Sequence, residues 1–226
     1  MNNSFVKCLT LAATLYCSAL AAQPDFDVVI ANGRVMDPST GTDHIANLGV
    51  RDGRIAAIST EVLVGTKTID ATGKVVAPVF IDTHFHGTLP IHYRMALRMG
   101  VTTAMDLEFG ASGSRIDEWY AQREGSSLIN FGTSVSHELA RASVLDGVDA
   151  IDTSEAYKSR PQPNWSRAIP TAQQQESLLA MARQGLNSGA IGIGSTLGYM
   201  PGVSADELFA VQSLSADFGR QISVHL

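Results

Sequence analysis

Residues 80–87 read Phe80-Ile81-Asp82-Thr83-His84-Phe85-His86-Gly87, an apolar run that leads into two histidines separated by one residue. Side chains at positions i and i+2 of a strand point to the same face, so His84 and His86 can converge on one cation. Asp82 shares that face and is placed to orient a ligand. The alternative is a pair of surface histidines beside a turn, because a lone His-x-His pattern is a weak signal.

The region before this stretch is typical of a small all-β module built from hairpins. Turn signals recur there as Asn32-Gly33, Asp52-Gly53 and Ala71-Thr72-Gly73, and such pairs flanked by apolar runs predict tight connections between strands. The strands are expected at 26–30, 34–37, 47–50, 54–58, 67–70 and 74–76.

From residue 79 onward, strand-like runs alternate with helical ones. Strands are predicted at 79–82, 102–108, 128–137, 190–196 and 221–226, with helices ending at Gly100 and spanning 114–123, 171–188 and 204–218. Thr171 with Gln174, and Ser204 with Glu207, have the spacing of capping boxes. Residues 138–170 are expected to form a long polar connection, of a length that is uncommon unless functional or mobile.

Repeated strand–helix units indicate a parallel sheet, either doubly wound or closed as a (β/α)8 barrel. No Gly-x-Gly-x-x-Gly motif follows a strand, so a dinucleotide-binding fold has no support. A complete barrel takes roughly 250 residues, whereas only five strands are visible here and the last one ends with the chain. We therefore expect a truncated sequence.

The first 22 residues have the pattern of a secretory signal peptide. Lys7 closes a short positive region, an apolar run extends from Cys8 to Leu20, and small residues follow up to Ala22. The run is shorter than the about 20 apolar residues that span a bilayer comfortably. Cleavage is expected after Ala21 or Ala22, and an uncleaved membrane anchor is the alternative.

Both cysteines, Cys8 and Cys17, lie in this leader. The mature chain would contain no disulfide and no thiolate ligand, so any metal site must use histidine and carboxylate. A net charge of −6 gives no basic surface for nucleic acid. We expect an exported protein, periplasmic or secreted by a bacterium, without a stable membrane anchor after cleavage and of unknown oligomeric state.

Three further side chains are candidates for substrate binding. His137 ends the third predicted strand and is placed to contact substrate or an oxyanion, with a structural histidine as the alternative. Arg141 could hold a carboxylate through two hydrogen bonds, although a solvated surface arginine is the simpler interpretation. Tyr199 follows the fourth strand and could donate to a scissile carbonyl, or form an aromatic wall.

Several stretches together resemble the amidohydrolase superfamily of metal-dependent hydrolases. Residues 26–37, 50–58 and 69–86 are similar to the opening, the next hairpin and the metal-binding strand of these enzymes. Residues 189–202 and the sequence Gly100-Val101-Thr102-Thr103 resemble the D-aminoacylase branch, the N-acyl-D-amino-acid deacylases.

This resemblance implies a fold and a domain arrangement. The expected fold class is α/β, a partial TIM-type (β/α)8 barrel of about five strands preceded by part of a small β-sandwich. The domains would be a signal peptide at 1–22, the N-terminal part of the β-sandwich at 23–78, and the N-terminal part of a metal-dependent hydrolase barrel at 79–226.

The resemblance also implies one or two divalent metal ions, usually zinc, and hydrolysis of the amide in a small N-acyl amino acid. His225 matches a later histidine ligand of the family, with an ordinary terminal histidine as the alternative. D-aminoacylases typically place a cysteine after the second strand, where this chain has Glu108. Glu108 could bind metal in its place, Asp106 is the second candidate, and Glu108 could instead orient substrate or a histidine.

The family's general acid/base is an aspartate expected beyond the end of this chain, so no catalytic residue is assigned and the chain alone is expected to be inactive or to need a complementing piece. A cyclic-amide hydrolase of the dihydroorotase or hydantoinase type is the second hypothesis, although residues 191–196 lack the lysine that those enzymes usually carry. A non-catalytic binding or remnant protein is the third, and it should hold no stoichiometric zinc.

Overall fold

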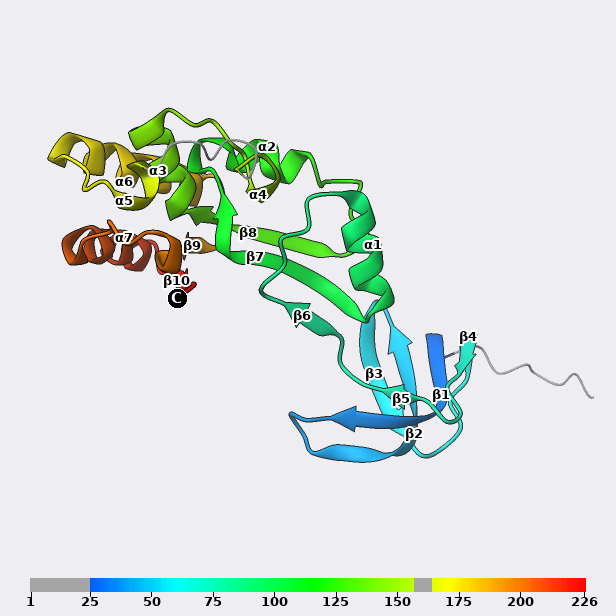
Figure 1. Ribbon diagram of the computed structural model, residues 1–226. Helices are drawn as coiled ribbons and strands as arrows, with labels where there is room; N and C mark the ends of the chain where they lie inside the picture. The colour runs from blue at the N-terminus through cyan, green and yellow to red at the C-terminus, as the bar shows by residue number, and fades with distance from the viewer. Residues whose placement is uncertain (1–24, 157–163) are drawn as a thin grey trace, which may run out of the picture. The chain divides into compact units, whose positions relative to one another are not determined.

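The computed structural model describes residues 25–156 and 164–226. The predicted signal peptide lies outside the described residues. The chain divides into two compact units, with the boundary between Pro78 and Val79, and both are drawn in Figure 1. Among the described helices, none combines the length and the apolar character needed to cross a membrane.

The first unit is a mixed five-stranded sheet in the order β3-β2-β1-β4, in which β5 also pairs with β1. Its strands are β1 (Phe26–Asp37), β2 (Thr42–Arg51), β3 (Arg54–Ser59), β4 (Gly65–Asp70) and β5 (Val75–Val76). The hairpin predicted at Asp52-Gly53 is present, since β2 and β3 pair antiparallel up to Arg51 and Arg54. Both turn residues have a positive φ, of 52° and 68°, which suits a tight hairpin connection.

Two expectations for this unit are wrong. Asn32-Gly33 does not end a strand: β1 continues through it with a shift in register against β2 between Ile30 and Gly33. Asn32 has a φ of 61°, so the pair forms a bulge. Likewise β4 and β5 do not form a hairpin, because both pair with β1 in parallel. Turn-forming residues therefore indicated where the backbone departs from a regular strand, but they did not predict which strands pair.

The second unit contains a parallel five-stranded sheet in the order β10-β9-β8-β7-β6. Its strands are β6 (Phe80–Asp82), β7 (Val101–Ala111), β8 (Asn130–Ser136), β9 (Gly192–Ser195) and β10 (Gln221–Val224). Strand order follows chain order, as it does in a barrel and unlike a doubly wound sheet. This curled parallel sheet confirms the predicted α/β half-barrel.

Helices alternate with these strands. They are α1 (Pro90–Arg98), η1 (Gly113–Arg115), α2 (Ile116–Ala121), α3 (His137–Asp146), α4 (Thr153–Ala156), α5 (Asn164–Arg167), α6 (Ala172–Asn187), η2 (Leu197–Tyr199) and α7 (Ala205–Asp217). The predicted helices agree in type and approximate bounds, and Thr171 and Gln174 form the expected capping box of α6.

The segment 138–170 differs from the long polar connection that we expected. Its described residues contain α3, α4 and α5, while residues 157–163 lie outside the described residues. The signal for α3 is weak in the sequence because His137, Glu138 and Arg141 are polar yet buried. A pattern of apolar residues cannot reveal a helix whose buried face carries charges.

The main core of the second unit lies between the sheet and the helices α2, α6 and α7. Buried members include Trp119, Val135, Leu186, Ile193 and Val211. The helix α6 approaches η1 so closely that an added Cβ on Gly113 would lie 2.1 Å from the carbonyl oxygen of Met181. This packing holds the strands whose carboxyl ends carry the candidate site.

Candidate metal centre

The candidate ligands come together at the carboxyl ends of the parallel strands. His84 and His86 follow directly after β6, Glu108 lies in the neighbouring β7, and His225 follows β10. Beyond the parallel pairing of β6 with β7, an isolated antiparallel bridge joins His84 to Asp106. This is the end of a barrel sheet at which active sites are built.

Glu108 is at the centre of the cluster. Its Oε1 lies 2.8 Å from His84 Nε2 and 3.3 Å from His86 Nε2, while its Oε2 lies 3.0 Å from His225 Nδ1. One donor atom each from His84, His86 and Glu108 lies within 4.8 Å of the others. Two imidazoles and a carboxylate form a donor set that suits zinc and related divalent metals.

Asp106, the second candidate for a carboxylate ligand, has other partners in this structure. Its Oδ2 lies 3.1 Å from His86 Nδ1, and its Oδ1 accepts a hydrogen bond from the backbone of Gly110 at 2.9 Å. The buried carboxylate therefore fixes the ring of His86 and leaves Nε2 facing Glu108. Asp82, expected to orient a ligand, accepts from the backbone N–H of His84 at 3.0 Å and does not bond to its ring.

The electrostatics of the cluster favour an ionised carboxylate. Burial opposes the charge on Glu108, but the hydrogen bond with His225 and the attraction to His84 outweigh it and hold the pKa of Glu108 below its usual value. The hydrogen bond with Asp106 raises the pKa of His86, and burial opposes this rise without cancelling it. A cation would thus meet a negative Glu108 at neutral pH.

Tyr199 lies beside this cluster, in contact with His225. Its ring stacks on that of His225 with 5.1 Å between centroids, and the residue is 51% exposed. The backbone connects the two residues as well, since the N–H of Gly198 donates to the carbonyl of His225. Tyr199 therefore presents an accessible phenol next to a candidate ligand.

His137 and Arg141 bond to buried partners, which for His137 agrees with the alternative of a structural histidine. Both are buried, and Arg141 is 0% exposed, so neither the substrate clamp nor the solvated surface arginine describes it. Arg141 donates to both carboxylate oxygens of Glu207 at 2.6 Å. His137 bridges Glu207 and Ser195, with both ring contacts at 2.8 Å.

The cluster of His137, Arg141, Ser195 and Glu207 was missed because Glu207 was interpreted as a capping residue of α7. Ser204 does cap that helix by accepting from the Glu207 N–H, but the Glu207 side chain turns to His137 and Arg141 instead. A signal was present in the sequence: Glu207 shares the helical stripe of the buried Val211 and Leu214. A carboxylate on an apolar stripe indicates a buried polar partner.

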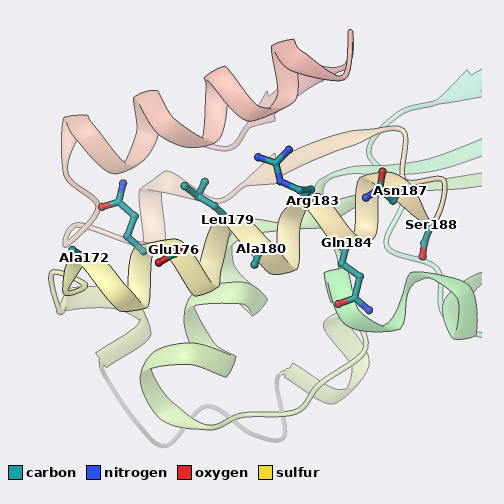
Figure 2. A pocket seen from close by; sticks show the side chains of 9 residues that line it. Ala172, Glu176, Leu179, Ala180, Arg183, Gln184, Asn187 and Ser188 are labelled. Atoms are coloured by element: carbon teal, nitrogen blue, oxygen red, sulfur yellow. The ribbon is translucent and has the colours of Figure 1, made fainter.

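An open hollow of about 840 Å³ follows α6 (Figure 2). Its lining comes from α6 and its C-terminal cap, and includes Glu176, Arg183 and Gln184. None of the candidate site residues lines it. The hollow therefore has no part in the candidate metal centre.

No model of a known protein family matches the chain. Among curated proteins, it is 29% identical to a D-aminoacylase from Alcaligenes xylosoxydans xylosoxydans over 88% of this chain and 44% of that protein. It is 28% identical to an N-acyl-D-glutamate deacylase from the same organism over 82% of this chain and 40% of that protein. A shorter match, over 26% of this chain, is 50% identical to a dihydroorotase from Streptococcus pneumoniae and covers 14% of it.

The comparison with solved structures identifies the same two kinds of enzyme. A D-aminoacylase structure superposes with a TM-score of 0.70 at 27% identity, over 89% of this chain and 45% of that one. The N-acyl-D-glutamate deacylase of Bordetella bronchiseptica, solved with zinc and a phosphonate inhibitor, gives 0.66 at 26% identity over the same shares. The chain thus spans less than half the length of these relatives.

The parallel half-barrel and its relatives define the class: this is an α/β protein that resembles the amidohydrolase superfamily, and its homologues act on carbon–nitrogen bonds other than peptide bonds. Among the curated relatives reported above, the long matches are to D-aminoacylase and N-acyl-D-glutamate deacylase. The family resemblance inferred from the sequence is confirmed.

Proposed function

We propose that the chain contributes the metal-binding part of a hydrolase that cleaves the amide bond of N-acyl-D-amino acids. The observation that carries this proposal is the position of Glu108, whose two oxygens contact histidines from β6 and β10 at the carboxyl edge of the sheet. The likeness to D-aminoacylase over nearly nine-tenths of the chain supports the substrate class.

His84, His86, Glu108 and His225 would hold the metal, and zinc suits their donor atoms. When bound, such an ion polarises a carbonyl and lowers the pKa of a water molecule. The protein's own contribution is to keep Glu108 ionised and to fix the ring of His86 through Asp106. Tyr199 is placed to donate a hydrogen bond to the substrate carbonyl from its position beside His225.

Because the chain spans less than half of its relatives, turnover by the whole enzyme belongs to the proposal and not to the findings. The general acid/base is not assigned among the described residues. Separately, we propose that the leader at 1–22 directs export, because its charged, apolar and small-residue regions follow one another in the order of a signal peptide.

A second candidate function is hydrolysis of a cyclic amide, as in dihydroorotase or hydantoinase. The 50% identity to a dihydroorotase over 60 residues favours it. The strand β9 (Gly192–Ser195), however, contains no lysine, whereas those enzymes typically use a modified lysine at the fourth strand. Among the curated relatives, the matches to deacylases extend over more of the chain, and hydrolysis of a cyclic amide is therefore the weaker hypothesis.

Isothermal titration of the zinc-loaded chain with a phosphonate analogue of an N-acyl-D-glutamate tests the proposal. We expect saturable binding of the D analogue, weaker binding of its L enantiomer, and loss of binding when zinc is removed by a chelator. Dihydroorotate and a substituted hydantoin serve as competitors. Binding of the cyclic amides in preference to the D analogue would favour the second candidate, and a chain that retains no zinc would contradict both.

A further inference from the structure

The backbone directly after His86 is held by a buried tyrosine. The hydroxyl of Tyr93, in α1, donates to the carbonyl of Gly87 at 2.9 Å. Tyr93 is 3% exposed and packs against the ring of Phe85 with 5.3 Å between centroids. Phe85 lies between the two histidines in sequence, so Tyr93 contacts the ligand-bearing segment through both a side chain and a carbonyl.

The tyrosine hydroxyl is in turn fixed by an arginine. Arg123 Nε donates to the Tyr93 oxygen at 2.8 Å. Burial raises the pKa of Tyr93, and Arg123 opposes this rise without cancelling it. The phenol therefore keeps its proton at neutral pH, and with its oxygen accepting from Arg123, that proton is directed to Gly87.

Arg123 has partners for each part of its guanidinium. The group lies 3.8 Å above the ring of Trp119, donates to the Trp119 carbonyl at 3.0 Å, and pairs with Asp152 at 3.1 Å. Asp152 is fixed by the N–H and hydroxyl of Ser154. Both side chains of the ion pair are 4% exposed, and a pair buried this deeply keeps one geometry only when its hydrogen bonds are satisfied.

A second contact holds the same turn. The ring Nδ1 of His92 accepts from the backbone N–H groups of Thr88 and Leu89 at 3.1 and 3.3 Å. The loop that leaves the histidine pair is thus attached to α1 at three successive residues, 87, 88 and 89. A change in α1 is therefore transmitted to the backbone that carries His86.

We propose that Tyr93 and Arg123 are positioning residues that set the distance of His84 and His86 from Glu108. The route consists of the buried hydrogen bonds from Asp152 through Arg123 and Tyr93 to Gly87. Neither residue touches the donor atoms, so their effect is exerted through the backbone. The inference rests on the proposed metal site. It assigns a role in metal binding to Tyr93 of α1 and to Arg123, which follows α2.

The test compares Tyr93→Phe with Tyr120→Phe. Both substitutions remove a tyrosine hydroxyl that donates to a glycine carbonyl, since Tyr120 bonds to Gly189 at 3.2 Å, away from the histidine pair. Zinc affinity is measured by competition with a chromophoric chelator, and the visible spectrum of the cobalt-loaded protein reports ligand geometry. Chemical denaturation of the metal-free proteins records stability.

For Tyr93→Phe we expect a zinc dissociation constant about 10-fold higher than the parent's, at the lower end of what outer-shell changes cost, and an altered cobalt spectrum. Tyr120→Phe should lose stability without either change. If Tyr93→Phe retains the parent's affinity and spectrum, the positioning role is overturned while the proposed function stands. If the parent itself binds no zinc, the proposed function fails and this inference fails with it.

Asp152→Asn provides an independent variant in case Tyr93→Phe does not fold. Its amide keeps one of the two oxygen acceptors, which serve Arg123 and Ser154 separately, and removes the charge that orients the guanidinium. A weaker zinc affinity than that of Tyr120→Phe supports the proposal, and an affinity equal to the parent's overturns it.

Discussion

At the residue scale, Glu108 and Asp106 differ in role although they share a strand face. Glu108 contacts three histidines and is partly exposed, whereas Asp106 is buried and its oxygens contact His86 and the backbone of Gly110. The sequence predicted both carboxylates near the carboxyl end of β7 and on one face, because residues i and i+2 of a strand share a face. It could not separate them, because the difference arises from partners distant in the chain.

Asp106→Asn should weaken zinc binding without abolishing it. The amide can still accept from Gly110 but no longer holds His86 as an ionised partner, and outer-shell changes of this kind cost about 10–100-fold in metal affinity. Chelator competition measures the effect. The exposed Asp149→Asn is the control, and equal zinc affinities in the two variants would argue against the orienting role of Asp106.

Arg141→Met should strongly destabilise the fold. Arg141 and Glu207 are both buried, and removal of one partner of such a pair leaves an uncompensated charge that costs about 3–5 kcal/mol. Urea denaturation gives the free energy of unfolding. The matched control is Arg115→Met, because its carboxylate partners Glu118, Asp149 and Glu155 all have exposed side chains. Here we expect a loss of about 1 kcal/mol or less. Similar losses at the two sites would refute the structural role assigned to Arg141.

At the element scale, the helices α6 and α7 were predictable because each has a periodic apolar stripe and a capping signal. The five strands of the second unit were predictable from strand-like runs that alternate with helical ones. The helix α6 is the clearest case, with Thr171 and Gln174 bonded as predicted. The helix α3 was not predictable, because its buried face carries His137, Glu138 and Arg141. Likewise, the turn at Ala71-Thr72-Gly73 predicted a hairpin, but strand pairing depends on the whole sheet.

The contact between α3 and α7 should make stability depend on pH. Burial disfavours the charge of Glu207, yet hydrogen bonds from His137 and Arg141 outweigh it and hold its pKa below the usual value. A lowered folded-state pKa contributes stability above the unfolded value of about 4.3, and this contribution is lost as the pH falls through the folded pKa.

We therefore expect the free energy of unfolding of the parent to fall between about pH 4.3 and more acidic values. Glu207→Gln should be less stable at neutral pH and should show a flatter profile over that range. Denaturant titrations from neutral to acidic pH measure both curves. A parent and a variant with parallel profiles would show that Glu207 does not carry this dependence.

At the scale of the whole molecule, the order β10-β9-β8-β7-β6 explains why residues far apart in sequence share one site. Glu108 and His225 are separated by 117 positions yet lie 3.0 Å apart, because parallel strands place their carboxyl ends at one edge. The alternation of strands and helices made this sheet predictable. The role of the His137 cluster required the three-dimensional structure, since its members come from three separate elements.

The proposed signal peptide at residues 1–22 leads to a prediction about localisation. Expressed with residues 1–22 in a Gram-negative host, the chain should be recovered from the periplasm after cleavage behind Ala21 or Ala22, as small residues precede signal-peptidase sites. Intact-mass analysis reads the new N-terminus directly. Recovery of a full-length chain from the cytoplasm would contradict the proposed export, and recovery with the membrane fraction would indicate an uncleaved anchor.

The central claim is that Glu108 joins His84, His86 and His225 in a metal site. Its most direct test is to strip the chain of metal, reload it with zinc, and measure its zinc content and zinc affinity. The isosteric variant Glu108→Gln is treated in the same way, and Glu118→Gln serves as a surface control. We predict stoichiometric zinc in the parent and the control, and a loss of affinity in Glu108→Gln that exceeds the about 10–100-fold typical of outer-shell changes. A parent without zinc, or a Glu108→Gln variant that binds it as tightly as the parent, would contradict the claim.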